Sequence, residues 1–188
     1  PDAVRAALGA EIAGLRPLAR GVAWVAAENL HVTLKFLGEV DPDRLDRVAA
    51  ALATVASGRA PFDLVVEGLG AFPSATRPRV VWAGLARGAH ALAALAVSVE
   101  DALAGLGFAR EARPFASHVT LGRAREPRPD PSLARAIGVA ASRAFGAARV
   151  DRVTLMGSEL HPRGARYTAL GAWPFPRLQG ERDDPPSG

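Results

Sequence analysis

The sequence contains the same four residues, His-Val-Thr-Leu, at two places. The first copy runs from His31 to Leu34 and the second from His118 to Leu121. The whole chain has only 4 histidines, so these two copies contain half of them. In an extended strand, successive side chains point to opposite faces. Each copy therefore predicts one histidine and one threonine on the same face of a strand.

Two such pairs in one site would provide the groups needed to cleave a phosphate diester. The ordinary pKa of histidine is about 6.5, so near neutral pH one imidazole can be neutral while another is charged. The neutral ring can take a proton from water, and the charged ring can give a proton to the leaving oxygen. The hydroxyls of Thr33 and Thr120 can donate hydrogen bonds to the remaining phosphate oxygens. This chemistry requires no metal ion.

Two less specific interpretations apply to the same residues. A single His-x-Thr in a strand is common, because threonine favours strands and its hydroxyl often bonds locally. Two histidines could also bind zinc. However, Glu28 and Glu39 flank only the first copy, and the second copy has no equivalent pair. Repetition of the motif therefore favours acid–base chemistry, and we expect neither a metal nor a cofactor.

Composition limits the class of protein. The chain has 188 residues, of which 49% are hydrophobic and 22% charged, as in ordinary soluble globular domains. Cysteine is absent, which excludes disulfides and thiolate nucleophiles and fits a reducing cytoplasm. No apolar run approaches the roughly 20 residues that span a bilayer. We expect a cytoplasmic monomer that does not interact with membranes.

The positive charge of the chain comes almost entirely from arginine. The formal net charge is +4, and Lys35 is the only lysine. Arginine matches the geometry of phosphate oxygens, although a GC-rich genome that encodes arginine in place of lysine is the simpler origin of this bias. In either case, a net positive field favours an anionic substrate.

The elements that must position the two motifs follow from hydrophobic periodicity. In the expected strand at 30–36, alternation places Leu30 and Phe36 on the inner face and Lys35 beside His31 and Thr33. The polar, Pro- and Gly-rich tail at 177–188 is expected to be disordered. Helical spacing predicts helices at 1–18, 41–57, 90–106 and 130–145. Strands are predicted at 22–26, 30–36, 62–72, 79–86, 114–123, 149–160 and 165–173.

One fixed offset relates the two halves of the chain. His118 lies 87 residues after His31, and the same offset moves Thr33 onto Thr120 and the helix at 43–57 onto 130–144. The order of elements predicts a duplicated unit of strand, helix, HxT strand, helix and strand. We therefore expect a single bilobal α+β domain over residues 1–176. The counterpart of the strand at 79–86 would lie before residue 1, so we infer that the first strand is missing from this sequence.

These motifs carry a family resemblance. "ENLHVTLKFLGEV", "RPRVVWAGL", "SHVTLGRAR" and "SELHPRGARYTAL" resemble motifs of the 2H phosphoesterase superfamily, and within it those of the RNA 2',3'-cyclic phosphodiesterases. This group is also known as the 2'-5' RNA ligases, or the LigT group. The similarity covers about residues 1–175. It implies a bilobal LigT-like fold with two antiparallel sheets lining a central cleft and helices outside. It also implies no cofactor, and RNA with 2',3'-cyclic phosphate ends as substrate, with tRNA fragments among the candidates.

The resemblance also implies a role for each residue of the motifs. His31 would donate a proton to the leaving 3' oxygen, and His118 would accept a proton from water. Thr33 and Thr120 would hold the phosphate. The product would be a 2'-phosphomonoester, and the same site could carry out reversible 2'-5' RNA ligation. The two motifs are identical, so the residues by themselves do not assign donor and acceptor.

Three further side chains are candidates for substrate contact. Lys35 could contact the phosphate or be a solvated charge. Arg123 points away from His118 by simple alternation, and it reaches the site only if a bulge or a strand end turns it. Tyr167 could stack on a base, or belong to the core or to the interface between the lobes.

Two alternative functions stay open at this point. The substrate could be a small cyclic phosphate of a nucleotide or a sugar, which a comparison of oligonucleotide and mononucleotide cleavage would reveal. The chain could also be a non-catalytic RNA-binding module whose histidines only hold phosphate. Strong, salt-dependent RNA affinity without turnover would favour that alternative.

Overall fold

The computed structural model describes residues 1–159 and 166–176, so the tail at 177–188 lies outside the described residues. Within them, none of the helices is long and apolar enough to cross a membrane. The elements are α1 (Asp2–Leu15), β1 (Val22–Trp24), the 3-10 turns η1 (Ala27–Asn29) and η2 (Pro42–Arg44), α2 (Leu45–Ser57), β2 (Phe62–Phe72), β3 (Val80–Leu85), α3 (Ala89–Ala104), β4 (His118–Ala124), α4 (Pro131–Val139), β5 (Ala144–Val150), β6 (Arg152–Glu159) and β7 (Arg166–Pro174).

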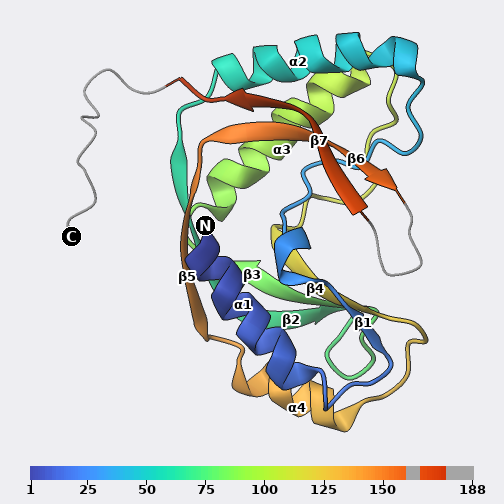
Figure 1. Cartoon of the computed structure of the whole chain (residues 1–188), viewed down its shortest axis with the longest axis vertical. Coiled ribbons are helices and arrows are strands. Elements are labelled where there is room, and N and C mark those ends of the chain that lie inside the picture. The colour runs from blue at the N-terminus through green and yellow to red at the C-terminus, as the bar shows by residue number, and fades with distance from the viewer. Residues whose placement is uncertain (160–165, 177–188) are drawn as a thin grey trace, which may run out of the picture.

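The strands form two antiparallel sheets. Five strands pair in the order β1-β4-β3-β2-β5, and β6 pairs with β7. Every pairing is antiparallel. Figure 1 shows α1 and α4 beside the larger sheet and α2 and α3 beside the β6–β7 pair. The predicted α+β class with antiparallel sheets is confirmed.

The first core lies between the five-stranded sheet and helices α1 and α4. The apolar residues of α1 are buried at the spacing expected from the sequence, and alternate residues of β3 and β4 pack against them. The helical members are Val4, Leu8, Ile12, Leu15, Leu133 and Ile137, and the strand members include Val81, Ala83, Val119 and Leu121. Because side chains alternate along a strand, the residues between these strand members point to the opposite face of the sheet.

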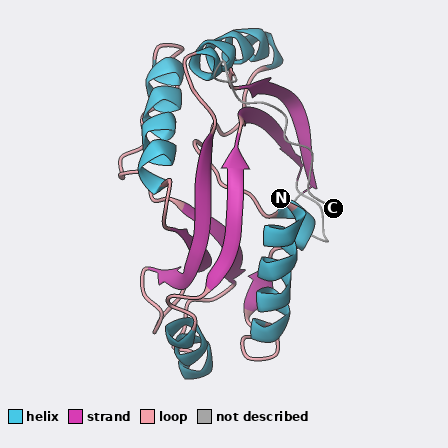
Figure 2. Cartoon of the chain, turned by 90° about the vertical axis from the view of Figure 1, so that its left-hand side faces the viewer, coloured by secondary structure: helices cyan, strands magenta, loops and turns pink. Residues whose placement is uncertain are grey.

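The second core lies between helices α2 and α3 and the β6–β7 sheet. Its buried members include Val48, Leu52, Leu95, Val99, Leu103 and Val153. Figure 2 shows the two pairs of helices toward opposite ends of the molecule, with strands between them. Val32 and Leu85 contact both cores. Val32 belongs to the first His-Val-Thr-Leu motif, so this motif lies where the two cores meet.

The expected strand at 30–36 is absent from the structure. Residues 30–40 have extended or irregular backbone and pair with no strand of the described chain. Phe36, expected inside, is 75% exposed. Alternation predicts an extended backbone, but it does not supply a neighbouring strand. Here the apolar side chains Leu30 and Val32 hold the segment against the cores instead.

The region after α4 also differs from the prediction. The helix expected to reach residue 145 ends at Val139, and Ala144–Val150 forms β5. The single strand expected at 149–160 is divided at Asp151 into β5 and β6, which belong to different sheets. The partner of β5 is β2, which is remote in the sequence. Such a non-local partner leaves no signal in local periodicity.

The helices keep the spacing of the proposed repeat. α1 begins at Asp2 and α3 at Ala89, which are 87 residues apart, and α2 and α4 begin 86 residues apart, at Leu45 and Pro131. The duplicated unit, its lobes and the missing first strand stay predictions.

Candidate active site

The two motif histidines make the same local hydrogen bond. Nδ1 of His31 lies 2.7 Å from the carbonyl oxygen of Asn29, and Nδ1 of His118 lies 2.7 Å from that of Ala116. A carbonyl oxygen can only accept, so Nδ1 donates its hydrogen in both rings. Nε2 is then the nitrogen that can take up or release a proton. The two motifs therefore share a tautomer as well as a sequence.

His118 lies on the open face of the five-stranded sheet. β4 begins at His118, and Thr120 lies on the same face, whereas Val119 and Leu121 are buried in the first core. The His118 ring meets the ring of Phe72 edge to face, with their centroids 5.3 Å apart. Aromatic packing of this kind limits rotation of the imidazole.

β4 contains a bulge just after Thr120. Trp82 of β3 lies opposite Thr120, but its neighbour Val81 lies opposite Gly122. β4 therefore has one extra residue, Leu121, at this point. Both Leu121 and Gly122 are buried. A bulge of this kind interrupts the alternation of side chains beyond it.

Arg123 lies immediately beyond this bulge. Its partner in β3 is Val80, two residues from Trp82, so Arg123 and Thr120 project from the same face of the sheet. The side chain of Arg123 is exposed. The sequence allowed Arg123 to reach the site only if a bulge or a strand end turned it. The structure contains such a bulge.

His31 is positioned by a turn and by the second sheet. It comes two residues after η1, and its ring lies 5.0 Å from the ring of Tyr167 in β7, at an interplanar angle of 65°. His31 and Thr33 are exposed. Leu30, which lies between η1 and His31, is buried. Tyr167 is 37% exposed and is therefore not a core residue, while base stacking and a position between the lobes stay predictions.

The two motifs are anchored in the same core. Leu30, which precedes His31, and Val119, which follows His118, are both buried members of the first core. β1 runs antiparallel to β4, so the chain that leaves β1 travels toward the end of β4 where His118 lies. The first motif thus lies against the two-stranded sheet and the second motif within the five-stranded sheet (Figure 1).

Lys35 does not follow the predicted alternation. Its side chain is 2% exposed, and Nζ donates to Oε1 of Glu100 and to the carbonyl oxygen of Ala109, each at 2.7 Å. The alternative of a solvated charge is wrong, because the ammonium is directed to α3 and the loop after it, and contact with the substrate stays a prediction. Alternation fails here because no ladder of hydrogen bonds holds residues 30–40 in a regular strand.

The carboxyl group of Glu100 responds to this contact. The hydrogen bond from Lys35 lowers the pKa of Glu100 below its ordinary value, and burial opposes this effect. The backbone N–H of Glu111 and the charge of Arg110 also lower this pKa. Glu100 is therefore held as a carboxylate that neutralises Lys35.

The described residues contain no set of metal ligands. Across 1–159 and 166–176, no three His, Cys, Asp or Glu side chains gather so that they could hold a metal ion. Glu28 and Glu39, which flank the first motif, do not form such a set with His31.

Comparison with known proteins relates this fold to one family. The model of the family described as "LigT like Phosphoesterase" matches residues 1–82 and 85–167. A protein of Archaeoglobus fulgidus named RNA 2',3'-cyclic phosphodiesterase is 41% identical over 150 residues, which are 80% of this chain and 82% of that protein. The crystal structure of TT0787 of Thermus thermophilus has a TM-score of 0.78 at 31% identity and covers 93% of both chains. That of E. coli LigT complexed with 3'-AMP has a TM-score of 0.72 at 28% identity, covering 93% of this chain and 92% of that one.

Proposed function

The chain belongs to the family of LigT-like phosphoesterases, and on this premise we propose that it hydrolyses RNA 2',3'-cyclic phosphate ends to 2'-phosphomonoesters. The substrate class is supported by the names of curated relatives, such as the RNA 2',3'-cyclic phosphodiesterase of Archaeoglobus fulgidus. The single observation that supports the chemistry is the pair of matched Nδ1 bonds, to Asn29 and to Ala116, which leave Nε2 of His31 and His118 for proton transfer.

In the proposed reaction, the two histidines act on opposite sides of the phosphorus atom. Nε2 of neutral His118 takes a proton from water while the water oxygen attacks phosphorus. Nε2 of charged His31 gives its proton to the 3' oxygen while the bond between phosphorus and that oxygen breaks. The products are a free 3' hydroxyl and a 2'-phosphate. The carbonyl oxygens of Asn29 and Ala116 stabilise whichever ring carries the positive charge.

The direction of proton flow rests on the family resemblance. Both rings have the same tautomer and the same backbone acceptor, so these local bonds favour neither histidine as donor. In the cycle, each histidine ends in the protonation state in which the other began. A reaction run in reverse then exchanges the roles of acid and base.

Threonine and arginine complete the proposed site. Negative charge increases on the non-bridging oxygens as phosphorus becomes five-coordinate. Hydrogen bonds from the hydroxyls of Thr33 and Thr120 and the positive charge of Arg123 would stabilise these oxygens. The same proton transfers, with the 5' hydroxyl of a second RNA in place of water, form a 2'-5' linkage. Neither reaction requires a metal ion.

Turnover of an RNA oligonucleotide with a 2',3'-cyclic phosphate end tests this function. The assay contains EDTA and compares the natural protein with His31→Ala, His118→Ala and His90→Ala. His90 is an exposed residue of α3 and provides the matched control. Each motif variant should lose about 10²–10⁴-fold in kcat, the usual contribution of general acid–base catalysis, while His90→Ala keeps full activity.

Other outcomes of this assay separate the alternatives. Full activity of His31→Ala would contradict the two-histidine mechanism, and loss of turnover in EDTA would contradict its independence of metal. Turnover of a nucleoside 2',3'-cyclic phosphate alone would indicate a small substrate. Tight, salt-dependent RNA binding without any turnover would indicate a binding module.

A further inference from the structure

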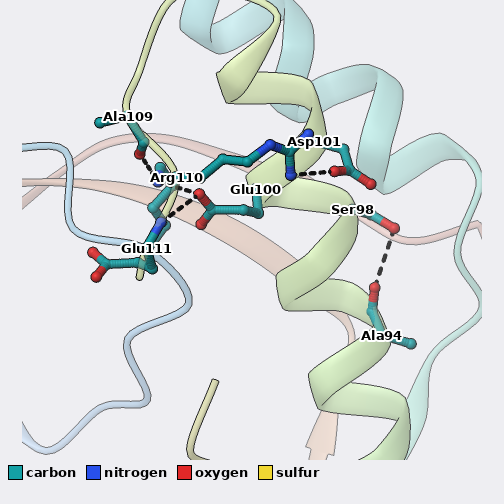
Figure 3. A network of polar contacts seen from close by, with 8 residues as sticks. Ala94, Ser98, Glu100, Asp101, Ala109, Arg110 and Glu111 are labelled. Atoms are coloured by element: carbon teal, nitrogen blue, oxygen red, sulfur yellow. Dashed lines mark hydrogen bonds and ion pairs between the residues drawn. The ribbon is translucent and has the colours of Figure 1, made fainter. Parts of the chain in front are cut away.

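One partly buried ion pair connects the segments that carry the two motifs. Oε1 of Glu100 accepts a hydrogen bond from Nζ of Lys35 at 2.7 Å and another from the backbone N–H of Glu111 at 3.0 Å. Lys35 Nζ also donates to the carbonyl oxygen of Ala109 at 2.7 Å. Figure 3 shows the contact between Glu100 and Glu111. Lys35 follows Thr33 by two residues, and Glu111 lies in the loop that leads to His118.

Both segments lack a ladder of backbone hydrogen bonds. Residues 30–40 follow η1, and residues 105–117 follow α3. Neither segment contains a strand or a helix. Segments without a ladder of backbone hydrogen bonds open most easily. Glu100 belongs to α3, which is fixed through the buried residues Leu95, Val99 and Leu103. The carboxylate of Glu100 makes a polar contact with each segment, in addition to the apolar packing of Leu34, Leu37, Phe108 and Phe115 against the second core.

We propose that Lys35 and Glu100, together with the backbone at 109–111, form a clamp that sets the position of His31 and Thr33 relative to His118 and Thr120. The proposal rests on the function proposed above. In-line attack on a cyclic phosphate requires the acid and the base to be aligned on either side of phosphorus. Misplacement of such groups by about 1 Å can cost on the order of 10²-fold in rate. Lys35 and Glu100 are in this proposal positioning residues.

Direct contact between Lys35 and the substrate phosphate is the competing role. An ammonium group has three donors, and two of them are occupied by Glu100 and Ala109. The side chain of Lys35 is 2% exposed. The third donor is shielded from solvent, and Glu100 already neutralises the charge. These contacts favour positioning, and the two roles differ in how Glu100 should respond to substitution.

The kinetic test uses Lys35→Met and Glu100→Gln, which remove one charge each with little change of shape. For both, we expect kcat to fall about 10-fold while KM stays within about twofold, because alignment acts on the transition state. The double variant should be no slower than Lys35→Met, since the two residues act as a unit. Lys35→Arg, which keeps the charge, should recover part of the loss.

Asp101→Asn is the matched control. Asp101 binds Arg110 at 2.6 Å and so also connects α3 to the loop at 109–111, but both side chains are exposed (Figure 3). This variant should keep the natural kcat and KM. A comparable loss in Asp101→Asn would overturn the clamp, because general loosening of the loop would then explain the effect.

Backbone hydrogen exchange tests the clamp without any substrate. Amides of residues 31–38 and 109–117 should exchange faster in Lys35→Met and Glu100→Gln, but not in Asp101→Asn. A raised KM in Lys35→Met with natural kinetics of Glu100→Gln would show direct substrate contact and overturn the proposal. Unchanged hydrogen exchange in both variants would also overturn it. If the natural protein does not turn over RNA ends, the proposed function fails while exchange still tests the clamp. If Lys35→Met does not fold, Glu100→Gln provides the test.

Discussion

At the scale of single residues, the two motifs combine a shared local geometry with different neighbours. In each, Nδ1 donates to the carbonyl oxygen two residues earlier in the chain, so the bond belongs to the motif itself. The ring of His31 then meets Tyr167, and that of His118 meets Phe72. Any difference in role between the two histidines must therefore come from their surroundings.

The prediction at the scale of single residues concerns Arg123. Because a hydrogen bond to a charged group is worth about 1.5–3 kcal/mol, Arg123→Met should lower kcat/KM on the order of 10-fold to 100-fold. Its free energy of unfolding should change little, since the side chain is exposed. Arg135→Met is the control, because Arg135 is an exposed arginine of α4, which covers the other face of the sheet. Equal rates in these two variants would exclude a role for Arg123.

At the scale of elements, the bulge in β4 decides which side chains reach the site. It inserts Leu121 and brings Arg123 to the face of Thr120. Gly122 makes the bulge compatible with β1, the edge strand that pairs with β4. A Cβ at residue 122 would lie 2.6 Å from Cγ1 of Val22 and 2.8 Å from Cε3 of Trp24. No side chain fits there unless the side chains of Val22 and Trp24 move.

Gly122→Ala should therefore destabilise the protein. Overpacking of this kind costs about 1–3 kcal/mol, and we expect the free energy of unfolding, measured by urea denaturation, to fall by that amount. Turnover should fall as well, because the bulge orients Arg123. Gly14→Ala provides a contrast: nothing lies within 4 Å of a Cβ at this position in α1. It should raise the free energy of unfolding by about 0.5–1 kcal/mol. A stabilising effect of Gly122→Ala would contradict this account of the bulge.

At the scale of the whole molecule, the Lys35–Glu100 pair fixes the segment that follows the first motif to α3, a helix of the second core. The pKa of Glu100 is lowered from its ordinary value of 4.5, chiefly by the hydrogen bond from Lys35. A carboxyl whose pKa is lower in the folded state stabilises that state above the unfolded pKa. This stabilisation is lost as the pH falls through the folded pKa.

The pH dependence of stability tests this link. At pH 7, Glu100→Gln should be less stable than the natural protein by about 1.5–3 kcal/mol, the value of a hydrogen bond to a charged group. The difference should shrink as the pH falls below 4.5, where protonation of Glu100 removes the same charge. Asp101→Asn should differ from the natural protein by less than about 1 kcal/mol, as expected for an exposed pair. A difference for Glu100→Gln that is constant from pH 7 to pH 3 would contradict this role of the ion pair.

Local properties of this protein could be predicted from its sequence. Helical spacing identified the buried residues of α1, Val4, Leu8, Ile12 and Leu15. Alternation identified β2 with its observed ends, and the second motif as a strand with His118 and Thr120 on one face. The two motifs also identified the family, which the comparisons confirm. These features depend on residues close together in the chain, so a periodic pattern is sufficient to reveal them.

Other properties were decided only by the tertiary structure. Burial of Lys35 depends on Glu100 and Ala109, which are 65 and 74 residues away. The orientation of Arg123 depends on a bulge whose register is defined by β3, and β5 exists because β2 offers it a partner. The first motif is not a strand, because no neighbouring strand pairs with it in the described chain. Periodicity reports which side of a segment is apolar, but pairing partners and ion pairs come from distant segments that only the folded chain brings together.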